Sequence, residues 1–229
     1  VVRKTDLIFA PSLSGRNQVY LKTENLQVTG SFKVRGAYYK ISQLTDEERE
    51  KGIIACSAGN HAQGVALAAQ KSEIPCLIYM PDGAPISKVE ATKSYGAEVC
   101  LTGDTYDDAY EAAQLRQEQD GRTFIHPFDD DYVMAGQGTI GLEILEQLQV
   151  RPTDKVAVIG DGKLGLLVAQ VMALAGCELT AVGRRGSHLE ILADRGISVL
   201  LASEVQCGGE MDVVVECTGN PEGFGVALR

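Results

Sequence analysis

The chain has 229 residues, enough for one large core or two small ones, and its 45% hydrophobic and 23% charged residues are ordinary globular proportions. Its formal net charge of −10, without a basic cluster, argues against nucleic acid or an anionic membrane as a partner. Six scattered cysteines with no C-x-x-C pair indicate free buried thiols rather than a disulfide framework or a zinc site. No apolar run reaches the length of a membrane span and no leader pattern opens the chain, so we expect a soluble cytoplasmic protein.

Two short strands, at residues 6–8 and 19–22, and a helix over residues 32–44 are predicted in the first part of the chain. Apolar side chains recur at helical spacing in that helix, and Ser31 can cap its start. Lys33 would lie in the first helical turn, where the helix dipole disfavours a positive charge. Partial desolvation would shift its amine toward the neutral, nucleophilic form that Schiff-base formation with a carbonyl compound requires. The alternative is that Lys33 is an ordinary surface lysine.

A buried strand followed by a turn of small and polar residues is predicted next. The strand is the apolar run at residues 53–56, and an alanine-rich helix is predicted over residues 61–71. The turn between them consists of Ser57, Ala58, Gly59, Asn60 and His61. Backbone N–H groups at such a helix start suit a carboxylate or a phosphate. The alternative is that Asn60 and His61 only cap the helix.

Short apolar strands alternate with longer helices over residues 52–148. Further strands are predicted at residues 76–80, 98–101 and 123–126, and further helices at residues 86–95, 105–119 and 133–148. This alternation predicts an α/β fold with a parallel sheet flanked by helices on both faces. Acidic residues mostly stand at helix starts, where the dipole favours them, and we interpret the aspartates at 129–131 as a helix cap rather than a metal site. His126 is interpreted as structural.

Together these separated motifs resemble the fold-type II pyridoxal-phosphate enzymes, and most closely the threonine ammonia-lyases. The resemblance covers about residues 5–148 and rests on the motifs at residues 21–25, 29–36, 55–64, 81–88 and 135–143. It implies that Lys33 is the catalytic residue, which holds pyridoxal 5′-phosphate as a Schiff base and takes the α-proton of threonine or serine. Loss of the β-hydroxyl would then give a 2-oxo acid and ammonia.

The same resemblance implies roles for the neighbours of Lys33. Phe32 would pack against the cofactor ring, and Asn60 would hydrogen-bond to its 3′-oxygen. Donors of the Ser57, Ala58, Gly59, Asn60 and His61 turn would surround the substrate carboxylate. The related serine racemases carry a second serine where this chain has Ala58, and its absence favours elimination over racemisation.

Beyond residue 148 the pattern changes. A fold-type II enzyme is expected to have a tetraglycine loop that binds the cofactor phosphate after its next strand. Here Gly160, Gly162 and Gly165 form a G-x-G-x-x-G motif after an apolar strand and at the start of a helix predicted over residues 163–175. Asp161 and Lys163 stand where glycines are expected, and an aspartate facing a phosphate would repel it.

Residues 152–229 resemble the nucleotide-binding part of the medium-chain zinc alcohol dehydrogenases. A strand at residues 178–182 ends near Arg184 and Arg185, and arginine there suits the 2′-phosphate of NADP. A helix at residues 187–195 and strands at residues 197–201 and near 211–217 are also predicted. The resemblance implies an NADP site formed by Gly160, Gly162, Gly165 and Arg184, with Gly219 and Asn220 near the cofactor.

The sequence therefore predicts a chimera of two parallel, helix-flanked α/β units. We expect an N-terminal segment at residues 1–49 with the Schiff-base lysine, a small cofactor domain at residues 50–150 and a partial Rossmann-like domain at residues 151–229. The first interpretation is a pyridoxal-phosphate-dependent threonine or serine ammonia-lyase, and an NADP-binding module without lyase activity is the alternative. A folded, inactive fusion is a third. Exposed strand edges would favour a homo-oligomer.

Overall fold

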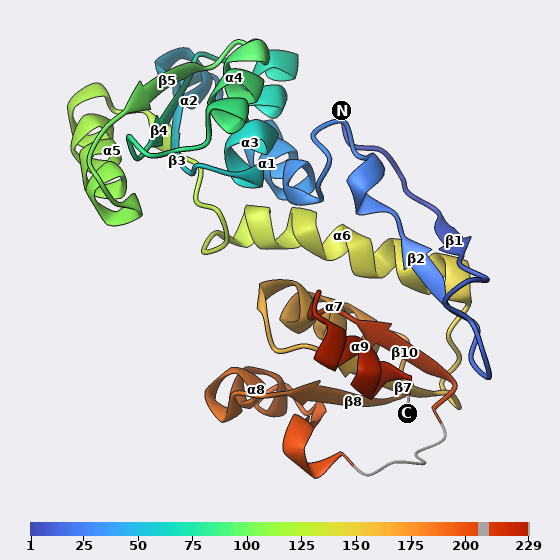
Figure 1. Ribbon diagram of the computed structural model, residues 1–229. Helices are drawn as coiled ribbons and strands as arrows, with labels where there is room; N and C mark the ends of the chain where they lie inside the picture. The colour runs from blue at the N-terminus through green and yellow to red at the C-terminus, as the bar shows by residue number, and fades with distance from the viewer. Residues whose placement is uncertain (206–210, 229) are drawn as a thin grey trace. The chain divides into compact units, whose positions relative to one another are not determined.

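The computed structural model describes residues 1–205 and 211–228 (Figure 1). The chain divides into two compact units, a first unit formed by residues 1–5 and 23–137 and a second unit formed by residues 6–22 and the described part of 138–229. The long helix α6 (Asp131–Leu148) supplies residues to both. These divisions differ from the boundaries predicted after residues 49 and 150, because the start of the chain is shared between the units.

The first unit contains a parallel sheet with the strand order β5-β4-β3-β6. Its strands are β3 (Ile53–Cys56), β4 (Cys76–Met80), β5 (Glu98–Leu101) and β6 (Thr123–Phe124). The helices between these strands are α3 (Asn60–Ser72), α4 (Ile86–Ser94) and α5 (Tyr106–Asp120). They are preceded by the short helix η1 (Glu24–Leu26), α1 (Lys33–Ser42) and α2 (Asp46–Lys51).

Side chains of the central strands alternate between two apolar layers. Ile53 and Ala55 belong to a core that includes residues of α1, α3 and α4, whereas Ile54 and Cys56 pack with Ala109 and its neighbours on α5. In Figure 1, α5 accordingly lies on the opposite side of this sheet from α1 and α3. All four strand residues are fully buried, which explains why the strand is a continuous apolar run.

The second unit contains a parallel sheet with the strand order β10-β7-β8-β9 and a separate antiparallel hairpin. Its strands are β7 (Lys155–Ile159), β8 (Glu178–Gly183), β9 (Ser198–Leu201) and β10 (Val213–Glu216), and the hairpin is β1 (Leu7–Phe9) with β2 (Tyr20–Lys22). The helices after α6 are α7 (Lys163–Ala173), α8 (Gly186–Ala193), the short η2 (Ala202–Glu204) and α9 (Pro221–Ala227). Hydrogen bonds from Leu7 N and Lys22 Nζ to Gln147 and Glu143 attach the hairpin to α6.

The predicted α/β class with parallel, helix-flanked sheets is confirmed, and most predicted elements agree with the observed bounds to within two residues. The expected cap of α1 is wrong. Phe32, with φ −66° and ψ −15°, already has a helical backbone and occupies the N-cap position without a side-chain cap. Ser31 is therefore one residue too early, and its buried hydroxyl has no hydrogen-bond partner among residues 1–205 and 211–228. The strand predicted over residues 123–126 ends at Phe124.

Both parallel sheets have the same connectivity. In each, the first strand is central, the next two strands follow on one side, and the fourth strand lies on its other side. The order in which the chain adds strands therefore reverses at the first strand of each sheet. The reversal lies between β3 and β6 in the first unit, and between β7 and β10 in the second. Ligands in open α/β sheets bind at such switch points, beyond the carboxyl ends of the strands. This rule places one candidate site after β3 and another after β7.

Two glycines allow α1 and α6 to pack backbone against backbone in the first unit. A Cβ atom on Gly136 would lie 2.6 Å from the Gly36 Cα and 2.7 Å from the Arg35 carbonyl oxygen. Gly136→Ala is therefore expected to lower the free energy of unfolding by about 1–3 kcal/mol, measured by urea denaturation. Gly138→Ala in the same helix is the matched control, because its Cβ would meet only Val171 at 3.6 Å. Equal effects of the two substitutions would contradict the close crossing.

Candidate active site

Lys33 is the first residue of α1, and its backbone is held from two sides. A Cβ on Gly64 would lie 3.1 Å from the Lys33 carbonyl carbon, so α3 approaches the Lys33 backbone closely. From α6, Gln137 Nε2 donates a hydrogen bond to the Lys33 carbonyl oxygen at 3.4 Å. The amine donates to the carbonyl oxygen of Pro127 at 2.8 Å and lies 5.6 Å from the centroid of the Phe32 ring. The side chain is partly buried. It is therefore an anchored amine rather than a fully hydrated one.

His61, the second residue of α3, is 3% exposed, and its Nε2 lies 2.9 Å from the carbonyl oxygen of Ile125. A carbonyl only accepts hydrogen bonds, so Nε2 carries the proton and Nδ1 of the neutral ring is an acceptor. Nδ1 and the Ser31 hydroxyl are buried without a hydrogen-bond partner in the described part of the chain. Buried polar atoms of this kind are rare in folded proteins and are explained by a ligand or water at the site.

The Ser57–His61 turn begins α3 without a side-chain cap. Gly59 is the N-cap residue, so neither Asn60 nor His61 caps the helix as the alternative interpretation proposed. The Ser57 hydroxyl accepts from Gly59 N at 3.2 Å, and Ala58 packs against the apolar core. The Asn60 side chain is exposed, and its Oδ1 accepts from Lys88 Nζ at 3.2 Å. Lys88 lies in a motif that supported the resemblance, but no role was predicted for it.

The order of the strands explains how Lys33 and His61 both reach the connection that follows β6. β3 and β6 are parallel neighbours, so the turn after β3 and the connection after β6 emerge at the same edge. That connection supplies the Ile125 carbonyl to His61 and the Pro127 carbonyl to Lys33. His126 between them accepts from Asp129 N through Nδ1 at 2.7 Å, in keeping with a structural role. Neither backbone carbonyl had a signal in the sequence.

The burial of His61 has a consequence for stability. Burial lowers the pKa of His61 to about 4. The hydrogen bond to Ile125 acts to raise this pKa, and the nearby charges of Lys33 and His126 add to the lowering. The unfolded chain then binds an extra proton between the unfolded pKa near 6.5 and pH 4, so this contribution to stability is complete above pH 6.5 and is lost as the pH falls toward 4. The loss is about 3 kcal/mol at 1.4 kcal/mol per pKa unit.

His61→Gln is expected to abolish this part of the pH dependence while keeping a donor for the Ile125 carbonyl. The measurement is the free energy of unfolding in urea between pH 4 and pH 7, taken as the difference between wild type and variant because carboxylates titrate in the same range. Parallel curves for the two proteins would show that His61 is not neutral in the folded state.

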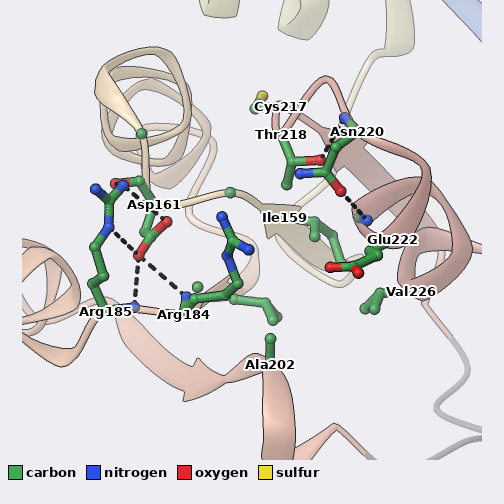
Figure 2. Close-up of a pocket in the computed structure, with 15 residues that line it drawn as sticks. Ile159, Asp161, Arg184, Arg185, Ala202, Cys217, Thr218, Asn220, Glu222 and Val226 are labelled. Atoms are coloured by element: carbon green, nitrogen blue, oxygen red, sulfur yellow. Dashed lines mark hydrogen bonds and ion pairs between the residues drawn. The ribbon is translucent and has the colours of Figure 1, made fainter.

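The glycine motif of the second unit forms a tight connection between β7 and α7. Gly160 has a φ of +126°, and a Cβ on Gly165 would lie 1.9 Å from the Gly160 carbonyl oxygen. A cavity of about 220 Å³ lies beside this connection and includes Gly160, Gly162 and Arg184 in its lining, with Thr218 from the end of β10. Figure 2 shows the Arg184 side chain extending between Asp161 and Glu222. Three of the four residues predicted for NADP thus line one cavity, and the fourth, Gly165, packs against the Gly160 carbonyl.

The Asp161 carboxylate turns toward the loop after β8 (Figure 2). It accepts from Arg184 N at 3.1 Å, from Arg185 N at 2.7 Å and from Arg185 Nε at 3.2 Å. Burial acts to raise the pKa of this carboxyl, but the hydrogen bonds and charge of Arg185 outweigh it and the pKa is lowered. The expectation that Asp161 repels a phosphate omitted this partner, because the two residues are 24 positions apart.

Residues 1–205 and 211–228 contain no group of three or more His, Cys, Asp or Glu side chains placed to hold a metal ion. Within the same ranges, no helix has both the length and the apolar character that crossing a membrane requires. Cys56 and Cys76 are free and buried, Cys100, Cys177 and Cys217 are free and partly buried, and Cys207 lies outside the described residues.

The chain has many relatives of known sequence. It is 53% identical over 176 residues to an L-threonine ammonia-lyase of Thermotoga maritima, which covers 76% of this chain and 43% of that protein. It is also 53% identical over 157 residues to a catabolic L-threonine dehydratase of Escherichia coli, covering 67% of this chain and 47% of the relative. The chain thus spans about half the length of these curated relatives.

Solved structures with similar folds include a threonine deaminase and a serine racemase. A processed threonine deaminase isoform 2 from Solanum lycopersicum superposes with a TM-score of 0.72 at 38% identity, covering 88% of this chain and 57% of that one. A serine racemase from Dictyostelium discoideum superposes with a TM-score of 0.67 at 34% identity, covering 81% and 61%. Such matches include most of both described units.

The family model for pyridoxal-phosphate dependent enzymes matches residues 1–194. This match continues well past the boundary predicted between residues 150 and 151, and the comparisons give no evidence for the dehydrogenase-like segment predicted over residues 152–229. The anchored Lys33 amine and the turn after β3 lie within the matched range. Because the match covers most of its length, the chain belongs to the family of pyridoxal-phosphate dependent enzymes.

Proposed function

We propose that this protein is a pyridoxal-phosphate-dependent ammonia-lyase that eliminates the β-hydroxyl of threonine or serine to give a 2-oxo acid and ammonia. The observation that carries the proposal is that one connection, the one after β6, hydrogen-bonds both to the Lys33 amine and to His61 of the Ser57–His61 turn at one edge of the first sheet. The 53% identity to a protein named L-threonine ammonia-lyase supports the choice of substrate.

The residues around Lys33 fit a pyridoxal-phosphate site. The Lys33 amine is present at the start of α1, and the Ser31 hydroxyl and His61 Nδ1, at the starts of α1 and α3, are buried polar atoms without a hydrogen-bond partner among the described residues. A Cβ on Gly59 would meet nothing within 4 Å, so the turn has open space for a ligand. Phe32, whose ring is near the amine, is suited to pack against an aromatic cofactor.

In the proposed reaction, bound pyridoxal phosphate supplies the electron sink that stabilises the charge left when the α-proton is removed. Lys33 Nζ would hold the cofactor covalently and, as a free amine during turnover, would take the α-proton of the substrate. The Ser57 hydroxyl and the backbone N–H groups of Asn60 and His61, the first two residues of α3, would orient the substrate carboxylate. Ala58 has no proton to deliver to the opposite face, which favours elimination over racemisation.

The test is a deamination assay on the purified protein with and without pyridoxal phosphate. With the cofactor, L-threonine is expected to yield 2-oxobutanoate and L-serine to yield pyruvate, each with one equivalent of ammonia. Protein treated with borohydride after loading is the control, because reduction fixes the cofactor on its amine and stops turnover. A loaded protein that releases no 2-oxo acid from either substrate would contradict the proposal.

We propose as a second candidate that the second unit binds NADP. Its strand order corresponds to the order 3-2-1-4 of dinucleotide-binding folds, and the cavity of about 220 Å³ lies at the switch point. Arg184 in the lining is suited to a 2′-phosphate. NADPH is then expected to raise the thermal unfolding midpoint more than NADH, and Arg184→Ala to remove the difference. No shift with either nucleotide would exclude this candidate.

A further inference from the structure

We propose that Lys88 is a positioning residue for the Ser57–His61 turn, one that fixes the side-chain amide of Asn60 and places a positive charge beside the substrate carboxylate. The inference rests on the proposed lyase function and deepens it. Its basis is the hydrogen bond from Lys88 Nζ to Asn60 Oδ1 at 3.2 Å, which joins α4 to the start of α3.

The chemistry of lysine determines which way the Asn60 amide faces. An ammonium group has only donors, so the Asn60 atom next to Lys88 must be the oxygen, and the amide nitrogen is turned away from Lys88. Asn60 then offers two N–H donors to a ligand at the turn. Without Lys88, the amide can rotate and present its oxygen instead, which would repel an anionic cofactor oxygen or a carboxylate.

Lys88 emerges from a well-anchored part of α4. Its N–H donates to the Pro85 carbonyl at 2.8 Å, and its own carbonyl accepts from the hydroxyl of Thr92 at 2.8 Å. Thr92 is fully buried and Val89, the next residue, is 6% exposed. The backbone at Lys88 is therefore fixed, and its partly buried side chain loses less conformational freedom in reaching Asn60 than a fully exposed lysine would.

The charge of Lys88 is not cancelled by an acid. Within residues 1–205 and 211–228, its hydrogen-bonding partner is an amide and no carboxylate forms an ion pair with it. By contrast, Lys93 on the same helix pairs with Glu90 at 3.4 Å and its side chain is 50% exposed. In a chain of net charge −10, an uncancelled cation next to an expected carboxylate site is suited to a substrate anion.

The experiment compares wild type with Lys88→Gln and Lys88→Arg, and uses Lys93→Gln as the matched control. The first readout is the affinity for pyridoxal phosphate itself, titrated by visible absorbance without any amino acid. The second is the L-threonine concentration that gives half of the absorbance change of the loaded protein. Circular dichroism establishes that each variant is folded.

Lys88→Gln is expected to weaken pyridoxal phosphate binding several-fold and to raise the half-saturating threonine concentration about tenfold, the size expected for a lost charge-assisted hydrogen bond. Lys88→Arg should recover most of both effects, and Lys93→Gln should stay within about twofold of wild type. If Lys88→Gln behaves as Lys93→Gln does in both titrations, the proposal is wrong. If wild type binds the cofactor but does not respond to threonine, the lyase function fails, and Lys88 is still judged by the cofactor titration.

Discussion

Lys33→Ala is expected to abolish the covalent attachment of pyridoxal phosphate and to lower the rate of threonine deamination by about 10²- to 10⁴-fold, the range typical of a lost proton-transfer group. The variant removes the amine that lies against Phe32 and the Pro127 carbonyl, while the α1 backbone keeps its contacts with Gly64 and Gln137. The measurements are the absorbance that borohydride reduces and the rate of 2-oxobutanoate release.

Lys40→Ala is the matched control for this variant. Lys40 lies on the same helix, and its amine pairs with Asp130 at 2.8 Å at the start of α6. Both side chains of this pair are largely buried, so the loss of Lys40 is expected to lower stability, while Asp130 keeps the backbone donors of Tyr132 and Val133 and cofactor attachment stays intact. If Lys33→Ala still forms the reducible adduct, or if Lys40→Ala loses it equally, Lys33 is not the attachment site.

Arg35→Ala is expected to lower the free energy of unfolding by about 3–5 kcal/mol, because it leaves a largely buried carboxylate without its partner. Arg35 is 3% exposed and binds Glu24 in a bidentate pair, with Nε and Nη2 each 2.7 Å from a carboxylate oxygen. Thr5 Oγ1 donates to the same carboxylate at 2.5 Å, so the pair ties the start of the chain to α1. Urea denaturation followed by circular dichroism measures the loss.

Two further variants distinguish the cost of leaving a buried carboxylate without its arginine from the contribution of the ion pair itself. The double substitution Arg35→Met with Glu24→Leu replaces the whole pair by apolar side chains and is expected to cost much less than Arg35→Ala alone. Arg116→Ala removes an ion pair at 2.7 Å to Asp120 whose arginine side chain is 47% exposed, and should cost far less than Arg35→Ala. A double variant as unstable as Arg35→Ala would show that the ion pair itself, rather than an orphaned charge, is responsible.

Apolar periodicity was sufficient to locate the regular elements. The runs at Ile53–Cys56 and Cys76–Met80 form strands with the predicted bounds because every residue in them is buried. Caps were harder to predict. Ser31 has the right side chain for a cap, but the backbone of Phe32 is already helical, and this depends on how α1 packs rather than on the sequence.

The candidate site was only partly predictable for a related reason. Lys33 and the turn after β3 have side chains and motifs that sequence reasoning can use. The carbonyl oxygens of Ile125 and Pro127 have none, since every residue has a carbonyl, and they reach His61 and Lys33 across 64 and 94 positions through the pairing of β3 with β6. The role proposed for Lys88 likewise depends on a contact between two helices.

The family to which the second unit belongs was the least predictable feature of the sequence. A glycine-rich turn after the first strand of a parallel sheet serves both nucleotide sites and simple tight connections, so its sequence pattern does not decide between them. The two sheets even share one strand order, which makes them similar in pattern. The family match to residue 194 favours a single family for most of the chain. Cytoplasmic location, self-association and a chimeric origin stay predictions of the sequence.

Attachment of the cofactor to Lys33 is the core of the proposed function. Its most direct test is to load the wild-type protein with pyridoxal phosphate, reduce it with borohydride, digest it and locate the added mass by peptide mass spectrometry. The predicted result is modification at Lys33 close to one equivalent, with Lys22, Lys40 and Lys88 unmodified. Modification spread over several exposed lysines, or confined to a residue other than Lys33, would contradict the account.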